Sequence, residues 1–266
     1  MASILITGAT NGLGLALAEE LAEAGHQLLL HGRDPQRLVP IAQRLGAEEY
    51  IADLSALAET QRLAAEVAAR HDRLDVLVNN AGVGFTWNGI TRSMSADGYE
   101  QRLAVNYLSP VLLTRELLPL LRAGSPSRIV NIASAAQEPI DFDDPQLLKE
   151  FTEVRAYSRS KLAMINWTAD LAEELAGTSV TANSVHPATF MPTSIQRNSG
   201  AEAQDTLESG IAATRRLIEA PELAEVSGRY YVKEEEKQPS HEWTLAPEYR
   251  RRLTDLTQHL LTSAGV

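Results

Sequence analysis

The amino-acid sequence predicts one α/β domain built on a doubly wound parallel sheet of about seven strands, with helices on both faces. Three observations lead to this prediction. Strand and helix patterns alternate along most of the chain, a glycine-rich turn joins the first strand to the first helix, and polar segments follow the ends of later strands. With 266 residues, of which 44% are hydrophobic, the chain 1–266 suits a single domain with one substantial core.

The alternation begins at the N-terminus. Apolar residues over 4–7 predict a strand, and Leu13, Leu17 and Leu21 recur at helical spacing until Gly25 supplies a helix stop. Since parallel strands need crossover connections, the repetition of this unit favours a parallel sheet. The following strands are predicted over 27–32, 49–53 and 74–80, and the following helices over 35–45 and 56–70.

The second half of the chain continues the pattern. Helices are predicted from about 95 to 121 and from near Tyr157, and strands over 128–133, 180–185 and 228–232. Residues 233–240 are interpreted as a solvated turn. An amphipathic helix closes the chain from Pro247, with Leu253, Leu256 and Leu260 on its buried face.

Two polar segments are predicted to cover a substrate. Residues 136–155 are acidic, and residues 189–210 are rich in Thr, Ser, Asn and Gly. Both follow predicted strands, and in open α/β sheets ligands bind beyond the carboxyl ends of the strands.

Composition disfavours several classes of function. The formal net charge is −11 and no sustained basic run occurs, so we expect no nucleic-acid partner and no membrane partner. The absence of cysteine excludes disulfides and thiolate chemistry. The N-terminus lacks the charged region of a signal peptide, and nowhere do about 18 apolar residues run together. The sequence therefore predicts a soluble, cytoplasmic protein.

The glycine-rich turn T-G-A-T-N-G-L-G contains Gly8, Gly12 and Gly14 between the first strand and the first helix. Backbone N–H groups and the helix dipole make such a helix start a natural phosphate site, and glycines let a pyrophosphate approach closely. A mere tight turn is the alternative interpretation.

The end of the second strand bears on cofactor choice. Arg33 after the small Gly32 can pair with a 2′-phosphate, whereas an acidic residue at this place would bind the ribose hydroxyls of NAD. This favours NADP(H) over NAD(H), unless Arg33 is an exposed side chain paired locally with Asp34. Asp53 ends the third strand, where it can accept from an adenine amino group or cap the next helix.

The sequence Y-S-R-S-K places Tyr157 and Lys161 four residues apart, on one face of a predicted helix. A nearby ammonium group favours the phenolate and lowers a tyrosine pKa, so the pair can form an acid/base device. Ser158 and Arg159 are expected to point elsewhere, and Arg159 to contribute little. Taken alone, the five residues are also compatible with an ordinary surface helix.

Five motifs in this order resemble the short-chain dehydrogenase/reductase family over nearly the whole chain. They are the glycine-rich turn, Asp53 with Leu54, N-N-A-G at 79–82, the pair Asn106 and Ser134, and Y-S-R-S-K. The block from I-D-F-D-D-P through R-A-Y-S-R-S-K-L-A, followed by N-S-V-H-P, is similar to the retinol-dehydrogenase-like branch.

This resemblance implies a Rossmann fold and an NADP(H)-dependent oxidoreductase that interconverts a carbonyl and an alcohol on a small molecule by hydride transfer. Tyr157 would be the general acid/base, Ser134 would hold the substrate oxygen, Lys161 would lower the tyrosine pKa and bind the nicotinamide ribose, and Asn106 would fix a relay water. No metal is required. The cofactor-binding residues implied are Gly8, Thr10, Asn11, Gly12, Leu13, Gly14, Arg33, Asp53, Leu54, Asn79, Ala81, Gly82, Tyr157, Lys161, Pro187 and Thr189.

The sequence departs from the family after the sixth strand, where Pro187 is followed by Ala188 instead of the usual glycine. We expect strain there and a small adjustment around the nicotinamide. Either Thr189 or Thr193 can contact the cofactor. His186 is expected to be structural, and Phe85, Trp87 and Met191 are candidates for either the substrate wall or the core.

Two other functions remain compatible with the motifs: a non-catalytic NADP-binding sensor or scaffold of the same fold, and an epimerase that uses a transient ketone. A homo-oligomer is possible, through the helices that would start near residues 100 and 157.

Overall fold

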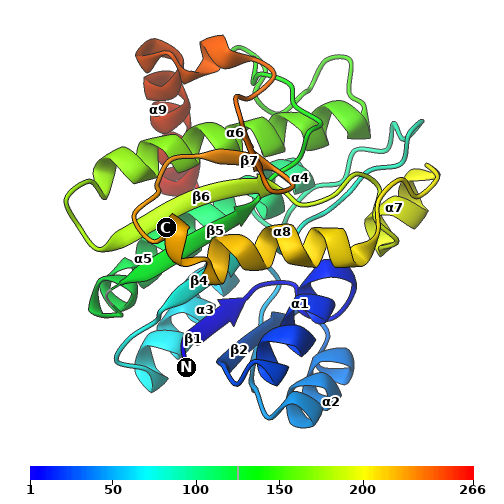
Figure 1. Cartoon of the computed structure of the whole chain (residues 1–266). Helices are drawn as coiled ribbons and strands as arrows, with labels where there is room; N and C mark the ends of the chain where they lie inside the picture. The colour runs from blue at the N-terminus through cyan, green and yellow to red at the C-terminus, as the bar shows by residue number, and fades with distance from the viewer. Residues whose placement is uncertain (125) are drawn as a thin grey trace.

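The protein folds around one mostly parallel sheet, as the computed structural model shows for residues 1–124 and 126–266 (Figure 1). Neighbouring strands follow the order β3-β2-β1-β4-β5-β6-β7-β8. The strands are β1 Ser3–Ile6, β2 Gln27–Gly32, β3 Glu48–Ile51, β4 Val76–Asn79, β5 Ser127–Ile132, β6 Val180–His186, β7 Tyr230–Val232 and β8 Glu235–Lys237. The α-helices are α1 Gly12–Glu23, α2 Pro35–Leu45, α3 Leu57–Arg70, α4 Gln101–Leu103, α5 Ser109–Ala123, α6 Glu153–Glu174, α7 Ser194–Ser199, α8 Leu207–Glu219 and α9 Pro247–Ser263.

The sheet confirms the predicted doubly wound α/β fold. Strands β1 to β7 pair in parallel, and Leu5 of β1 lies opposite Leu29 of β2 on one side and Leu77 of β4 on the other. The eighth strand was not expected, because residues 233–240 were interpreted as a turn. Strand β8 instead pairs antiparallel with β7 and forms an exposed edge of the sheet. Its charged side chains disfavour pairing of this edge strand with another chain.

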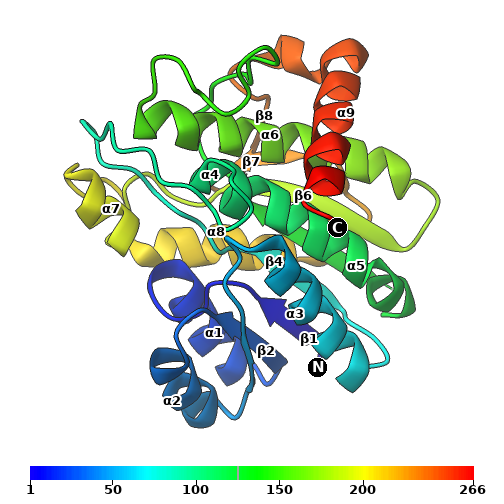
Figure 2. The same ribbon diagram turned by 180° about the vertical axis from the view of Figure 1, so that it is seen from behind.

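Alternate strand residues point into two apolar layers, one on each face of the sheet. Ile4 and Ile6 belong to the layer that includes residues of α1, α2 and α8, whereas Leu5 belongs to the layer that includes residues of α3, α5, α6 and α9. The two views from opposite sides show these two helical layers (Figure 1, Figure 2). The strands read as continuous apolar runs because both of their faces are covered.

Helix boundaries differ from the prediction where side chains cap the chain. The helix expected from about 95 starts at Gln101, because the Glu100 carboxylate accepts from the backbone N–H groups of Arg102 (2.8 Å) and Leu103 (2.9 Å). A π-helical turn, Ala104–Leu108, then precedes α5. In the polar segment 189–210, threonines at the N-caps start α7 and α8, so residues that suggested a loop are helix caps.

The C-terminal helix α9 covers the surface of α5 and α6. The Tyr107 hydroxyl lies 2.7 Å from Thr257 Oγ1, and the Tyr99 hydroxyl donates to the Leu260 carbonyl at 2.7 Å. Helix α9 lies against α6, and its Gln258 accepts from Arg115 of α5 at 3.2 Å, so it contacts both helices through which a homo-oligomer was considered possible. Among the described helices, none combines the length and the apolar character needed to cross a membrane.

The packing of α9 can be tested at Leu253, which is fully buried. The substitution Leu253→Ala should lower the free energy of unfolding by about 2–5 kcal/mol, because it removes buried methyl groups and leaves a cavity. Asp255→Ala, on the exposed face of the same helix, is the control and should change stability by less than about 0.5 kcal/mol. Urea unfolding measures both, and equal effects would contradict the assigned faces of α9.

Candidate active site

A cavity of about 560 Å³ opens at the carboxyl edge of the sheet, where the strand order reverses between β1 and β4. The predicted cofactor and catalytic residues, with the exceptions of Asn79 and Asn106, line this cavity. They are Gly8, Thr10, Asn11, Gly12, Leu13, Gly14, Arg33, Asp53, Leu54, Ala81, Gly82, Ser134, Tyr157, Lys161, Pro187 and Thr189.

The glycine-rich turn needs its glycines. Gly8 and Gly12 have φ of 70° and 54°, in the left-handed region, and a Cβ atom on Gly8 would lie 2.8 Å from the Ala81 Cα. A Cβ atom on Gly14 would collide with the Gly8 carbonyl and the Asn80 side chain. These glycines therefore let the turn pack tightly against Ala81 and Asn80, and the turn and the start of α1 line the cavity, where a helix N-terminus suits a phosphate.

Two residues that the sequence analysis did not single out hold this turn. The Asn80 amide donates to the carbonyls of Thr7 (2.7 Å) and Gly8 (3.2 Å). The Gly8 N–H donates to His31 Nδ1 at 3.2 Å, which leaves the His31 Nε2–H to donate to the Ala52 carbonyl at 3.0 Å. Burial lowers the pKa of His31 to about 4, so the ring is neutral and can accept at Nδ1.

Arg33 is exposed at the rim of the cavity, and Asp34, the local partner considered from the sequence, contacts other residues. Asp34 caps α2 by accepting from the Gln36 N–H at 2.9 Å and lies 3.8 Å from Arg37. Within the described chain no ion pair joins Arg33 to Asp34, so the local pairing considered from the sequence does not form. A Cβ atom on Gly32 would lie 2.6 Å from the Thr10 side chain, so a side chain at position 32 would require Thr10 to move.

Asp53 does not cap α3, because the N-cap of this helix is Ala56 and the Leu57 N–H donates to Asp97 at 2.9 Å. The Asp53 Oδ1 accepts from the Ser55 N–H at 2.9 Å, which shapes the turn before α3, and the residue lines the cavity beside Leu54.

Helix α6 and the end of β5 bring the predicted catalytic residues together. The Lys161 ammonium lies 5.7 Å from the centre of the Tyr157 ring and donates to the Ile132 carbonyl at 2.7 Å. Ser134 follows β5, and its hydroxyl accepts from the Ala136 N–H at 3.1 Å. Tyr157 and Lys161 therefore share the predicted face, and they are buried rather than part of a surface helix.

The electrostatics of this pair differ from the prediction. Burial raises the pKa of Tyr157, and the adjacent Ser134 hydroxyl acts in the opposite direction. Burial also lowers the pKa of Lys161 to about 8. The expected lowering of the tyrosine pKa by Lys161 is not found in the chain alone, because burial has the largest effect on the pKa of each group.

Asn79 and Asn106 lie behind the cavity. The Asn79 amide donates to Thr114 Oγ1 (3.0 Å) and Asn131 Oδ1 (2.8 Å), which ties the central strands to α5. Asn106 lies in the π-helical turn and binds both backbone groups of Val83, accepting from its N–H at 2.7 Å and donating to its carbonyl at 3.0 Å.

Arg159 does not behave as expected. Its side chain points away from Tyr157, but it is buried, forms an ion pair with Glu138 at 3.0 Å and donates to the Asp144 carbonyl at 3.0 Å. Arg159 thus anchors the segment 136–155, which folds back over α6, and this structural role was not expected from the sequence.

The segment 189–210 begins with a strained residue, but not at Ala188. Phe190 has a φ of 46°, whereas Ala188 is outside the left-handed region. The Thr189 hydroxyl lies 3.0 Å from His186 Nε2, and the Thr189 N–H donates to Asp205 at 2.7 Å. Thr193 also lines the cavity, and α7 beyond it lies over the glycine-rich turn, with the Ser194 hydroxyl 3.3 Å from Asn11.

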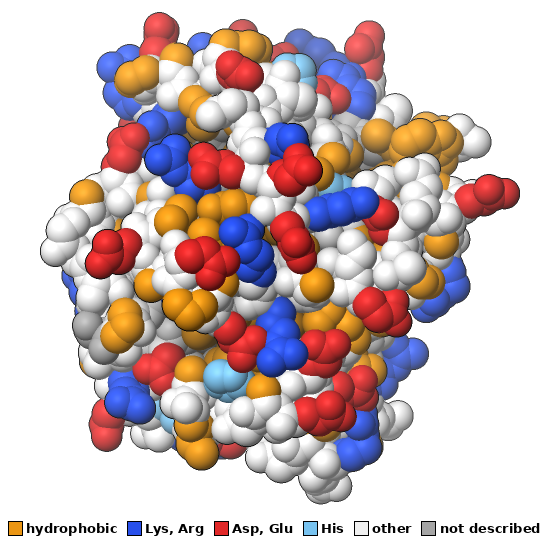
Figure 3. Space-filling view, viewed as in Figure 1, with side chains coloured by type: hydrophobic (Ala, Val, Ile, Leu, Met, Phe, Trp, Pro, Cys, Tyr) orange, Lys and Arg blue, Asp and Glu red, His pale blue; other side chains and the backbone are white. Residues whose placement is uncertain are grey.

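Aromatic side chains lead from Tyr157 to the surface. Phe85 packs on Tyr157 with ring centres 5.0 Å apart, and Trp87 packs on Phe85 at 5.5 Å. Phe190 meets Trp87 edge-on at 6.3 Å, and Met191 also lines the cavity. Trp87 is 61% exposed, and hydrophobic side chains gather at the edge of the molecule beside α7 (Figure 3).

A doubly wound sheet, a glycine-rich phosphate turn at the strand reversal and a tyrosine–lysine pair beside it define a dinucleotide-dependent oxidoreductase. The sequence profile of the short chain dehydrogenase family matches residues 2–204. Human retinol dehydrogenase 13 is 33% identical over 265 residues, which cover 90% of this chain and 78% of that protein.

Solved structures agree on the fold. A Pseudomonas aeruginosa RhlG/NADP complex has a TM-score of 0.70 and 28% identity, and the match covers 87% of this chain and 94% of that chain. A 3-ketoacyl-(acyl-carrier-protein) reductase from Brucella melitensis complexed with NADH has a TM-score of 0.72 and 21% identity, with 87% and 96% covered. The chain belongs to the short-chain dehydrogenase/reductase family. It is an oxidoreductase that acts on CH–OH or C=O groups with NAD(P), and it is similar to retinol dehydrogenases.

The neutral state of His31 predicts a pH dependence. Because burial lowers its pKa from 6.5 to about 4, the unfolded chain binds a proton that the folded chain does not bind. The stability that His31 contributes is therefore complete above its unfolded pKa and falls by up to about 1.4 kcal/mol per pH unit as the pH drops below it. His186, whose pKa burial also lowers to about 4, acts in the same direction.

Urea unfolding between pH 8 and pH 4 measures this effect. The variant His31→Asn keeps an amide oxygen as an acceptor for the Gly8 N–H and has nothing to titrate, so its stability should depend less steeply on pH. If the free energy of unfolding changed with pH in the same way in the variant and the parent protein, His31 would not be buried in its neutral form.

Proposed function

We propose that the protein reduces a small-molecule carbonyl with NADPH, or oxidises the corresponding alcohol, with Tyr157 as the general acid/base. The observation that carries this proposal is the convergence of Tyr157, Ser134 and Lys161 at one side of the cavity, next to the glycine-rich turn. A sensor or scaffold has no need of a buried phenol and amine in such a place.

The residues around the cavity support binding of a dinucleotide with a 2′-phosphate. The backbone at the start of α1 would hold the pyrophosphate, Asp53 the adenine, and Lys161 the nicotinamide ribose. Arg33, free of Asp34, supports a preference for NADP(H), since a guanidinium can bind a phosphate in a bidentate manner. When bound, the cofactor supplies or accepts the hydride at the substrate carbon.

The residues of the chain handle the oxygen and the proton. Ser134 donates a hydrogen bond to the substrate oxygen and so orients the carbonyl toward Tyr157. Because burial raises the pKa of Tyr157, the phenol carries its proton at neutral pH, and it can give this proton to the oxygen as charge develops there. This protonation state favours carbonyl reduction, whereas alcohol oxidation needs the phenolate and would be promoted by high pH.

Two further residues support this step. The ammonium group of Lys161 stabilises the phenolate left by proton transfer, and its pKa of about 8 lets it exchange protons near neutral pH. Asn106 fixes the backbone of Val83 beside this pair and would hold the water that relays protons to solvent.

The role of Tyr157 is tested by Tyr157→Phe, which keeps the ring and its contact with Phe85 but removes the hydroxyl. Turnover should fall by about 10²- to 10⁴-fold, the range for a lost general acid/base, while NADPH binding and stability persist. Steady-state kinetics, fluorescence titration and thermal unfolding measure the three quantities.

Tyr107→Phe is the matched control, because Tyr107 is a buried tyrosine that does not line the cavity and whose hydroxyl lies 2.7 Å from Thr257 Oγ1. It should cost about 1 kcal/mol of stability and leave turnover intact. Retention of most of the turnover by Tyr157→Phe would refute the proposed mechanism.

Cofactor choice is tested by Arg33→Ala. If Arg33 binds the 2′-phosphate, the variant should bind NADPH about 1.5–3 kcal/mol more weakly, the value of a charge-assisted hydrogen bond, and NADH nearly as before. Arg37→Ala, which removes the exposed partner of Asp34, is the control. Calorimetric titration with both cofactors decides the question, and equal losses for NADPH and NADH would speak against a phosphate contact.

A further inference from the structure

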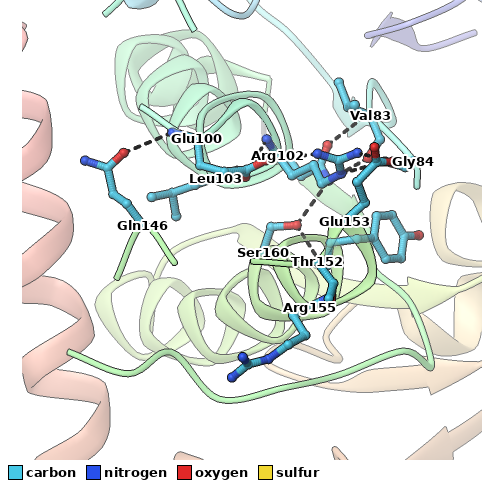
Figure 4. Close-up of polar contacts among 12 residues, drawn as sticks. Val83, Gly84, Glu100, Arg102, Leu103, Gln146, Thr152, Glu153, Arg155 and Ser160 are labelled. Atoms are coloured by element: carbon cyan, nitrogen blue, oxygen red, sulfur yellow. Dashed lines mark hydrogen bonds and ion pairs between the residues drawn. The ribbon is translucent and has the colours of Figure 1, made fainter. Parts of the chain in front are cut away.

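A buried ion cluster lies between the start of α4 and the start of α6, outside the cavity (Figure 4). The Arg102 side chain is 6% exposed, and its Nη1 donates to Glu100 at 3.0 Å while its Nη2 lies 2.7 Å from Glu153. Its Nε donates to the Gly84 carbonyl at 2.7 Å, so the guanidinium joins two carboxylates and one backbone oxygen.

The second half of the cluster reaches the same stretch of backbone. Glu153 Oε2 accepts from the Thr86 N–H at 2.8 Å and from the Thr86 hydroxyl at 3.0 Å. The Glu153 N–H donates to the Gly89 carbonyl at 2.9 Å. Since Glu153 is in the first turn of α6, the helix dipole also favours its negative charge there.

These contacts fix residues 82–89, which we call the pocket wall. Asn106 holds the backbone of Val83, Arg102 holds Gly84, and Glu153 holds Thr86. Between these points the wall carries Phe85, whose ring packs on Tyr157. A loop has little regular hydrogen bonding of its own, so the position of Phe85 depends on these side chains.

We propose that Arg102 is a positioning residue for Tyr157: with Glu153 it holds the pocket wall in place, and the wall holds the tyrosine ring through Phe85. Glu153 precedes Tyr157 by one helical turn, so the cluster fixes the wall relative to the same helix that carries the phenol. The effect on turnover rests on the proposed function, whereas the effect on the wall does not.

The test uses Arg102→Met, which keeps most of the side-chain volume but removes the charge and all three donors. We expect amide exchange at 83–89 to speed up by about tenfold or more, with strand β4 unchanged. With NADPH and benzaldehyde or hexanal as probes, kcat should fall by about 10- to 100-fold while the NADPH Kd stays within about twofold, since small misplacements of reacting groups have such effects. Arg102→Lys, which keeps the charge but not the planar fork, should recover part of kcat.

The matched control is Arg250→Met. Arg250 also joins two carboxylates, Asp170 and Glu173, but it ties α9 to α6 away from the cavity. It should lower stability and leave the exchange of the wall and kcat unchanged. Thr86→Val, which leaves the ion cluster intact and removes one donor to Glu153, gives a milder version of the same test if Arg102→Met does not fold.

The two readouts separate the proposals. Faster amide exchange confined to the pocket wall supports the positioning role even if the parent protein reduces neither aldehyde. A failure of the parent protein to reduce both aldehydes would count only against the proposed function for these probes. Unchanged exchange at the wall, or faster exchange there with an unaltered kcat, would overturn the role of Arg102. A uniform rise in amide exchange across the sheet would show that the cluster only stabilises the fold, and it would overturn the positioning role of Arg102 as well.

Discussion

Strand β1 pairs in parallel with β2 on one side and β4 on the other, and the position of the site depends on this pairing. The chain leaves the two neighbouring strands in opposite directions, so a crevice forms where they part. Asn80 bonds the end of β4 to the turn after β1, and His31 bonds that turn to the end of β3. The phosphate turn, Arg33 and the tyrosine–lysine pair all follow strands that end at this edge, and this common edge brings them around one cavity.

Burial then sets the chemistry at the inner end of the crevice. Tyr157 and Lys161 are both removed from water, and Lys161 has the Ile132 carbonyl as its hydrogen-bond partner. Desolvation favours the uncharged form of each group, so a neutral phenol and a readily deprotonated amine lie side by side. This arrangement suits a proton donor whose proton must be replaced in each turnover. The pocket wall also constrains the position of the phenol, because the Phe85 ring packs on the Tyr157 ring.

The fold and most of the site were predictable from the sequence because they depend on local patterns. Helical and strand periodicity located the main elements, and the spacing of Gly8, Gly12 and Gly14 indicated a phosphate turn. The four-residue spacing of Tyr157 and Lys161 predicted their shared face. These features need no knowledge of distant residues.

The features that the sequence could not predict depend on long-range contacts. Arg159 and Arg102 look like ordinary surface arginines until Glu138 and Glu153 are found beside them in space. The role of His31 follows from a contact with Gly8, 23 residues away in the chain. The sign of the Tyr157 pKa shift also escaped prediction, because the extent of burial is a property of the packed structure.

The central claim is that the chain transfers a hydride between its cofactor and a substrate carbon. The most direct measurement is the reduction of a carbonyl substrate in ordinary water with NADPH that carries deuterium in place of both hydrogens at C4 of the nicotinamide. Direct hydride transfer predicts an alcohol that bears the deuterium on its carbinol carbon, formed in equal amount with NADP⁺. An alcohol without the label, or interconversion of epimers without accumulation of NADP⁺, would contradict it.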